Sequence, residues 1–279
     1  MGCIPVATAR GIWVRNRVKR VISQGKMALG GLTGSFGGST IVEVMGHSGL
    51  DAAVIDLEHN GLGLDQVQAM IIAADAVDIT PIVRIPDLDR GLITRLLDMG
   101  AGGIQLDGIG SAEQARELVD AMLFPPLGTR GLIWNSRSAR FGTVNKTDYA
   151  EMANAEALVK ISIDDQAGLD NVEEIAAVPH VDIIGVGAHD LASVFGAIGA
   201  PDHPALAAAI DRVTKAVTAS GPGRLALPLN SSAYPLSAAD LVSLGVAYTN
   251  LQPHPEQRLV KAISAQAQTI RDAAAGGRR

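Results

Sequence analysis

Short apolar runs alternate with amphipathic segments along most of the chain. The runs lack regular polar/apolar alternation, which is typical of strands covered on both faces. They predict eight strands, at 28–36, 52–57, 81–85, 103–106, 158–163, 181–186, 224–229 and 246–251. Between them, apolar positions at helical spacing predict helices at 39–46, 64–76, 90–98, 112–122, 168–177, 204–220, 238–244 and 256–274. A further helix is expected at 16–24, before the first strand.

Eight strand–helix units in succession predict the α/β class and a (β/α)8 TIM barrel with one extra N-terminal helix. We expect residues 1–279 to form this single domain, with a core over about 16–275. The last expected helix carries Leu259, Val260, Ile263 and Ile270 on one stripe. That stripe indicates packing on a neighbouring subunit in a homo-oligomer, a trimer or a hexamer.

The composition of the chain argues against several classes of binding partner. The formal net charge is −6, and no basic block precedes the terminal Arg278 and Arg279, which argues against a nucleic-acid or anionic-membrane partner. No apolar run reaches the length of a membrane span. Cys3 is the only cysteine, so no intrachain disulfide can form. Together these features predict a cytoplasmic protein.

Polar residues gather where the expected strands end. In a TIM barrel these ends surround the active site. The residues at these positions are Asp56, Glu58, His59, Arg84, Asp107, Ser162, Asp164, Asp165, His189, Asp190, Asn230 and His254. Because Arg84 is among them, we expect a small anionic substrate.

Lys160 interrupts the otherwise apolar strand 158–163. Side chains alternate along a strand, so Lys160 and Ser162 share a face and should both point into the barrel. A buried ammonium needs a carboxylate partner or a lowered pKa, and Asp107 and Asp190 are the expected partners. Three roles stay open: an ammonium that stabilises negative charge, an amine that forms a Schiff base, and a lysine that only fills the barrel.

Several stretches together resemble one family. They are GKMALGGLTGSF (25–36), AVIDLEHN (53–60), PIVRIPD (81–87), RLLDMGAGGIQ (95–105), SAEQARELVDAMLFPPLGTRG (111–131) and VDIIGVGAHDLA (181–192). The chain is similar to the HpcH/HpaI aldolase/citrate lyase family, whose class II aldolases cleave 4-hydroxy-2-oxo acids to pyruvate and an aldehyde. The resemblance implies a C-terminal helix exchanged between subunits and a divalent metal, Mg or Mn.

The resemblance also implies roles for single residues. His59 would be the catalytic base, Arg84 would bind the 2-oxo acid, and Asp98 would assist the histidine of a neighbouring subunit. Asp190 would bind the metal, while the amides of Gly187, Ala188, His189 and Asp190 would bind the substrate carboxylate.

The second metal ligand departs from the family pattern. The family has a glutamate where this chain has Ser162, and a proline where it has Asp107. Asp164 is the expected substitute ligand, because it lies on the same strand face. We therefore also consider a metal-independent enzyme that uses Lys160 and His59 for another enolate reaction in a biosynthetic pathway. A non-catalytic carboxylate-binding protein is a further alternative.

The connection over 124–157 is long for a compact barrel, which favours a functional loop. It contains Arg130, Arg137 and Arg140, which we expect to be structural or interfacial.

Overall fold

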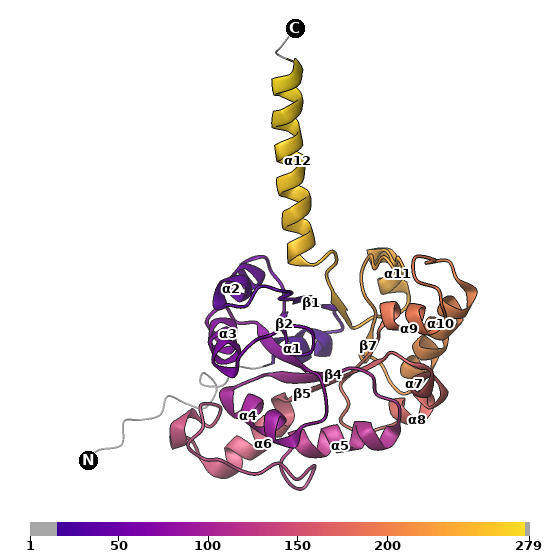
Figure 1. Cartoon of the computed structure of the whole chain (residues 1–279). Coiled ribbons are helices and arrows are strands. Elements are labelled where there is room, and N and C mark those ends of the chain that lie inside the picture. The colour runs from indigo at the N-terminus through magenta and orange to yellow at the C-terminus, as the bar shows by residue number, and fades with distance from the viewer. Residues whose placement is uncertain (1–15, 277–279) are drawn as a thin grey trace.

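The computed structural model describes residues 16–276. Eight parallel strands close a barrel in chain order, which confirms the expected (β/α)8 fold (Figure 1). The strands are β1 (Ala28–Leu32), β2 (Ala52–Asp56), β3 (Thr80–Ile85), β4 (Gly103–Leu106), β5 (Leu158–Ile163), β6 (Ile183–Val186), β7 (Leu225–Ala226) and β8 (Tyr248–Asn250).

Helices surround the barrel. They are α1 (Arg17–Ser23), α2 (Ser39–His47), α3 (Leu64–Ala76), α4 (Arg90–Met99), α5 (Ala112–Met122), α6 (Lys146–Glu156), α7 (Gln166–Asp170), α8 (Val172–Ala176), α9 (Ala188–Val194), α10 (Pro204–Ala219), α11 (Ala238–Ser243) and α12 (Pro255–Gly276). A short 3-10 helix, Arg140–Gly142, lies in the connection between α5 and α6.

The structure differs from the sequence prediction at three helices. The expected helix 168–177 is two short helices, α7 and α8, divided at Asn171. Helix α6 was not predicted, because it buries only Tyr149 and so lacks a clear apolar stripe. Helix α9 was not predicted either, and it is only seven residues long.

Alternation along the strands separates two layers of apolar side chains. Ile55, Val83 and Ile104 belong to the large core between the strands and the outer helices. Val54 and Ile82 belong to a smaller cluster within the barrel, which also contains Val18 of α1. Helix α1 therefore closes the N-terminal end of the barrel. Polar side chains occupy the interior toward the C-terminal ends of the strands.

Helix α12 leaves the C-terminal end of β8 and projects away from the barrel (Figure 1). Its apolar residues Leu259, Val260, Ile263 and Ile270 are exposed, the last three by more than 60%. This confirms the expected helix and leaves its apolar stripe uncovered in a single chain.

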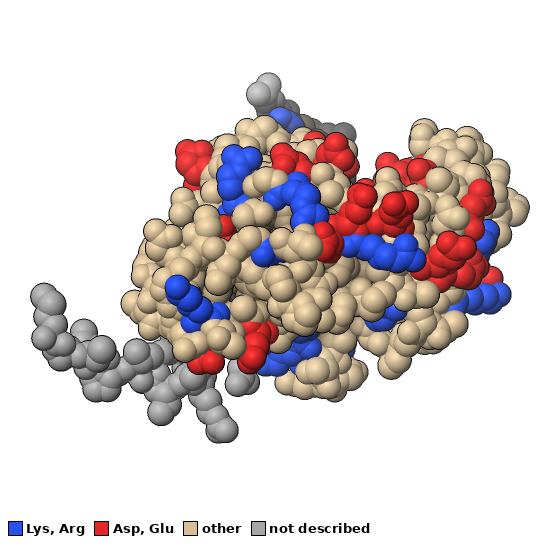
Figure 2. Space-filling view, turned by 90° about the horizontal axis from the view of Figure 1, so that it is seen from below, with Lys and Arg blue, Asp and Glu red and all other residues tan. Residues whose placement is uncertain are grey.

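Charged side chains of both signs are interspersed on the face seen in Figure 2. Within residues 16–276, no helix is both long and apolar enough to cross a membrane.

Candidate active site

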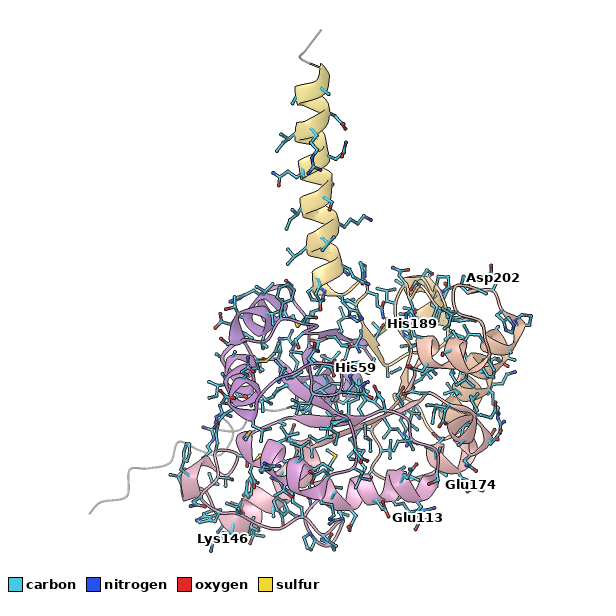
Figure 3. All side chains as sticks on the ribbon, in the orientation of Figure 1. His59, Glu113, Lys146, Glu174, His189 and Asp202 are labelled. Atoms are coloured by element: carbon cyan, nitrogen blue, oxygen red, sulfur yellow. The ribbon has the colours of Figure 1, made fainter. Side chains whose placement is uncertain are left out.

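A cavity of about 330 Å³ opens at the C-terminal ends of the barrel strands. His59, Arg84, Lys160, Ser162 and Asp190 all line it, so the structure brings together most of the residues predicted from the sequence. Figure 3 shows His59 and His189 over the barrel, whereas Glu113 and Glu174 lie on the outer helices.

Arg84 makes hydrogen bonds and ion pairs with three carboxylates at the cavity. Its Nε and Nη2 donate to Asp56 Oδ1 and Oδ2 at 3.0 and 2.7 Å. Its Nη1 lies 3.3 Å from Glu58 Oε2 and 3.2 Å from Asp107 Oδ2. Burial alone would lower the pKa of Arg84, but the hydrogen bonds and charge of Asp56 outweigh burial and raise it above its usual range. Three carboxylates therefore hold the guanidinium charged and in one orientation.

His59 lies at the rim of the cavity with its side chain 69% exposed. Its Nε2 is 3.6 Å from Glu58 Oε2. The backbone N–H groups of Glu58 and His59 donate to Asp56 Oδ1, which fixes the loop after β2. Burial raises the pKa of Glu58, although the nearby Arg84 opposes this. The predicted base is therefore accessible and adjoins an acceptor with raised proton affinity.

Lys160 is buried within the barrel with only 4% of its surface exposed. Its Nζ lies 5.5 Å from the centroid of the Tyr248 ring. Burial lowers the pKa of Lys160 to about 8, while the charge of Asp107 opposes the fall. The expected ion pairs with Asp107 and Asp190 are not observed among residues 16–276, because Asp107 instead accepts from Arg84 and Gln105. The predicted ion pairs are therefore wrong. Lys160 contacts the Tyr248 ring instead, and Asp107 attracts it without forming an ion pair.

A hydrogen bond joins Ser162, near the end of β5, to Asp164, which directly follows the strand. Ser162 Oγ donates to Asp164 Oδ1 at 2.5 Å, and the Gly108 N–H donates to Asp164 Oδ2 at 2.9 Å. Burial, followed by the charge of Asp107, raises the pKa of Asp164 to about 7. A Cβ atom at Gly187 would collide with Asp164 Oδ1 and would lie 3.0 Å from Asp190 Oδ2. Two carboxylates therefore converge over Gly187.

The turn that follows β6 begins α9 at Ala188. The Gly187 N–H donates to Ile163 O, so this amide is not available for a ligand, contrary to the prediction. Within the described residues, the amides of Ala188, His189 and Asp190 have no backbone acceptor, as is usual for a first helical turn. His189 Nε2 lies 3.4 Å from Ser231 Oγ.

Asp98 lies outside this cavity. Its Oδ1 accepts from Arg130 Nη2 at 2.7 Å, and the buried Arg130 also stacks on Phe124 at 4.5 Å. Arg137 forms an ion pair with Asp75. Both arginines therefore have the structural role expected for them. Within one chain the structure does not bring Asp98 to His59.

Sequence reasoning did not select three further residues that line the cavity, namely Gln105, Tyr248 and Asn250. Gln105 Oε1 is buried without a partner among the described residues. The Tyr248 hydroxyl donates to Asn250 Oδ1 at 2.8 Å and occupies space that only a glycine at position 30 leaves open. The period-two alternation of the strands contained the signal for Gln105, which is the register partner of Lys160.

His254 is among the polar residues expected at the strand ends, although the sequence assigned it no role. In the structure it is partly buried in the cavity wall, and its Nδ1 is buried without a partner among residues 16–276. Burial lowers the pKa of His254, while the charge of Glu256 opposes this and Arg84 and His189 add to it.

The family model described as HpcH/HpaI aldolase/citrate lyase matches residues 37–248. A relative from Roseobacter denitrificans named hydroxypyruvate/pyruvate aldolase is 33% identical over 207 residues, which cover 74% of this chain and 80% of that protein. Another, named 2-dehydro-3,6-dideoxy-6-sulfogluconate aldolase, from Pseudomonas putida, is 37% identical over 62% of this chain and 67% of its own length.

A solved structure from Burkholderia cenocepacia agrees with this match. It is described as an HpcH/HpaI aldolase/citrate lyase family protein and superposes with a TM-score of 0.81 at 29% identity. The similarity covers 91% of this chain and 98% of that one.

Proposed function

Because the chain belongs to the HpcH/HpaI aldolase/citrate lyase family, we infer that it is an aldolase-like carbon–carbon lyase acting on a 2-oxo acid. The resemblance identified from the sequence motifs is thereby confirmed at the level of the family. We propose pyruvate as the oxo acid that is released or used, together with an aldehyde. The observation that carries this proposal is the convergence of Arg84, Lys160 and the amides of α9 on one cavity.

The substrate carboxylate would bind the amides of Ala188, His189 and Asp190. The 2-oxo group would then face Arg84 and Lys160 deeper in the barrel. In cleavage, a base removes the proton of the 4-hydroxyl, the C3–C4 bond breaks, and its electron pair forms the enolate of pyruvate. Protonation of C3 completes the product. Two cations in a partly dry site stabilise the enolate oxygen more strongly than water does.

The reaction needs proton transfer at two different atoms. We propose His59 for the 4-hydroxyl, because it is the accessible histidine beside Glu58. His254 is our proposal for C3, because its partly buried imidazole lines the same cavity with a buried Nδ1 that lacks a partner among the described residues. A neutral imidazole can remove a proton from pyruvate in the direction of carbon–carbon bond formation.

The family's aldolases generally use a divalent metal ion. Asp164 and Asp190 fit such an ion, since their carboxylate oxygens converge over Gly187, and Ser162 orients Asp164. When bound, the ion would polarise the 2-oxo group as a Lewis acid. Lys160 lies in the same cavity with a positive charge, which weakens the attraction of this site for a cation.

Lys160 contributes a positive charge to the cavity. At pH 7 a lysine with a pKa of about 8 is still mostly an ammonium, so we propose that it stabilises the enolate. The Schiff-base role is the second candidate, and it is favoured by the same lowered pKa, since the neutral amine is the nucleophile.

Exchange of the pyruvate methyl protons in D₂O, followed by proton NMR without any aldehyde, tests the proposed function. We expect the full-length protein to catalyse exchange, because exchange requires only enolate formation. Exchange that persists with EDTA would favour the metal-independent alternative. Binding of pyruvate without exchange would overturn the proposal and favour a carboxylate-binding protein.

A further inference from the structure

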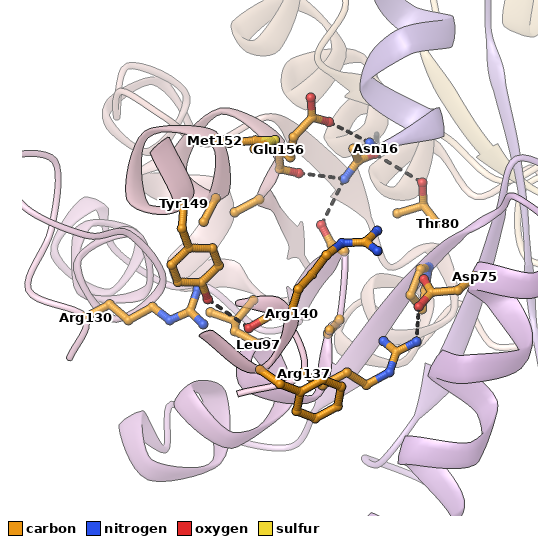
Figure 4. Close-up of a pocket in the computed structure, with 18 of the residues that line it drawn as sticks. Asn16, Asp75, Thr80, Leu97, Arg130, Arg137, Arg140, Tyr149, Met152 and Glu156 are labelled. Atoms are coloured by element: carbon orange, nitrogen blue, oxygen red, sulfur yellow. Dashed lines mark hydrogen bonds and ion pairs between the residues drawn. The ribbon is translucent and has the colours of Figure 1, made fainter. Parts of the chain in front are cut away.

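A second cavity, of about 510 Å³, lies at the end of the barrel opposite the candidate active site (Figure 4). Thr80 and Gly102, at the N-terminal ends of β3 and β4, form part of its wall. Residues from α4, α6 and the connection between α5 and α6 complete it. The volume is in the range of small-molecule sites, roughly 300–1,000 Å³. Nothing in the proposed reaction uses this cavity.

Three arginines line this cavity, and two of them have acidic partners. Arg137 pairs with Asp75, and Arg130 pairs with Asp98. The third, Arg140, is only partly exposed and makes no side-chain hydrogen bond or ion pair with any residue that the structure describes. Figure 4 shows its guanidinium extending into the space framed by Asn16, Tyr149 and Asp75. A partly exposed guanidinium that no protein acceptor engages keeps its N–H donors available for an anionic ligand.

The backbone at this position supports the same interpretation. Arg140 and Phe141 both have left-handed φ angles, of 48° and 55°, and Gly142 follows at 82°. Left-handed geometry is unfavourable for residues with side chains and collects at ligand-binding positions. The strain does not serve to bury Phe141, which is 72% exposed. It does present Arg140 to the cavity.

The remaining wall limits what this anion can be. Asn16 uses its side-chain amide to bind the carbonyl groups of Gly102 and Glu156, at 2.9 Å each. The Glu156 carboxylate accepts from the Asn16 N–H at 2.6 Å and has no arginine or lysine partner among the described residues. A wall with one free cation and one carboxylate favours a ligand with an anionic head and several hydroxyl donors.

We propose that this cavity is a second ligand site, which binds a small polyhydroxylated carboxylate or phosphate through Arg140. The anionic head pairs with the guanidinium, and the hydroxyl groups face Glu156 and Thr80. The site is separate from the cavity that contains Arg84 and Lys160, so the proposal does not depend on the proposed function.

Isothermal titration calorimetry on the full chain tests this site. The probes are inorganic phosphate, D-gluconate and D-gluconate 6-phosphate, which separate the contributions of the phosphate, the carboxylate and the hydroxyl groups. We expect D-gluconate or its 6-phosphate to bind, and Arg140→Gln to weaken that binding by about tenfold or more, the usual effect of losing a charge-assisted hydrogen bond. Arg140→Lys should retain part of the affinity, because it retains the charge.

Two control variants test whether the binding is specific to the cavity that contains Arg140. Arg116→Gln makes the same charge change on the exposed face of α5 and should leave binding unchanged. Arg84→Gln alters only the candidate active site and should also leave it unchanged. The proposal is overturned if none of the three probes binds, if inorganic phosphate alone binds, if Arg140→Gln binds as tightly as the unmodified protein, or if Arg84→Gln abolishes the binding.

Discussion

Lys160 holds its ammonium nitrogen 5.5 Å from the centre of the Tyr248 ring, while the nearby Asp107 accepts from Arg84 and Gln105 instead of from the lysine. The aromatic face attracts the cation but does not replace a hydrogen-bond acceptor. Burial of the charged lysine therefore costs free energy of folding. The protein nevertheless has this lysine in its candidate active site. A pure filler of the barrel would not need the charge.

Lys160→Met should stabilise the protein. The fall in the pKa of Lys160 from 10.5 to about 8 corresponds to about 3 kcal/mol against the charged form in the folded state. Between pH 8 and 10.5 the unfolded chain keeps this proton and the folded chain does not, so stability contributed by this group rises with pH through that window. Below pH 8 the whole penalty is present. The variant should thus gain about 3 kcal/mol at pH 7, and the gain should fade toward pH 10.5.

Urea unfolding of both proteins at pH 7 and pH 10 measures this difference. Lys26→Met is the matched control, because Lys26 is exposed and its loss should change stability little at either pH. A Lys160→Met variant less stable than the unmodified protein at pH 7 would mean that the ammonium has a strong acceptor in the fold. Unchanged pyruvate exchange in the same variant would reduce Lys160 to a barrel filler.

Borohydride distinguishes the two chemical roles of the lysine. Because a lysine with a pKa of about 8 is roughly nine-tenths protonated at pH 7, we expect no reduced pyruvate adduct on Lys160 at that pH. Peptide mass spectrometry after incubation with pyruvate and borohydride makes the measurement, with Lys160→Met as the blank. An adduct on Lys160 that the blank lacks would replace the ammonium role with a Schiff base.

Much of this site could be predicted from the sequence, because strand periodicity fixes which residues point inward. Lys160 and Ser162 were placed in the barrel on that basis, Arg84 was placed at the rim because it ends a strand, and all three line the cavity. Periodicity does not indicate which of several nearby donors a buried carboxylate will accept from. Asp107 was expected to pair with Lys160, but Arg84 and Gln105 occupy its oxygens. The sequence placed His254 near the strand ends but could not indicate its role, because it lies in the irregular segment between β8 and α12.

Ser162→Glu should strengthen metal binding. Carboxylate oxygen is the ligand that Mg²⁺ and Mn²⁺ prefer, and the proposed ligands of the unmodified site are Asp164 and Asp190. We expect weak Mn²⁺ binding in the unmodified protein and a gain of at least about tenfold in the variant, measured by the free Mn²⁺ signal in electron paramagnetic resonance. Asp190→Asn should weaken binding in both backgrounds. Tight stoichiometric Mn²⁺ in the unmodified protein would show that two aspartates suffice.

His59→Ala and His254→Asn should fail at different steps. If His59 serves only the 4-hydroxyl, His59→Ala should lower the rate of aldol cleavage by roughly 10²–10⁴-fold, the usual contribution of a general base, and leave pyruvate proton exchange largely intact. His254→Asn should lower both rates. Both positions lie outside the strands and helices, so circular dichroism should report unchanged folding. Loss of exchange in His59→Ala alone would transfer the C3 role from His254 to His59.

The exposed stripe of α12 should make the protein an oligomer. Val260, Ile263 and Ile270 are each more than 60% exposed on a helix that extends away from its own barrel, and together with Leu259 they form an apolar surface that a neighbouring subunit would bury. Sedimentation velocity at micromolar concentration should show a trimer or a hexamer. Ile263→Asp should shift the protein toward smaller species, whereas Lys261→Asp, on the same helix but outside the stripe, should leave the assembly intact. A monomeric unmodified protein would contradict the prediction and would also remove any route for Asp98 to act on the His59 of a partner.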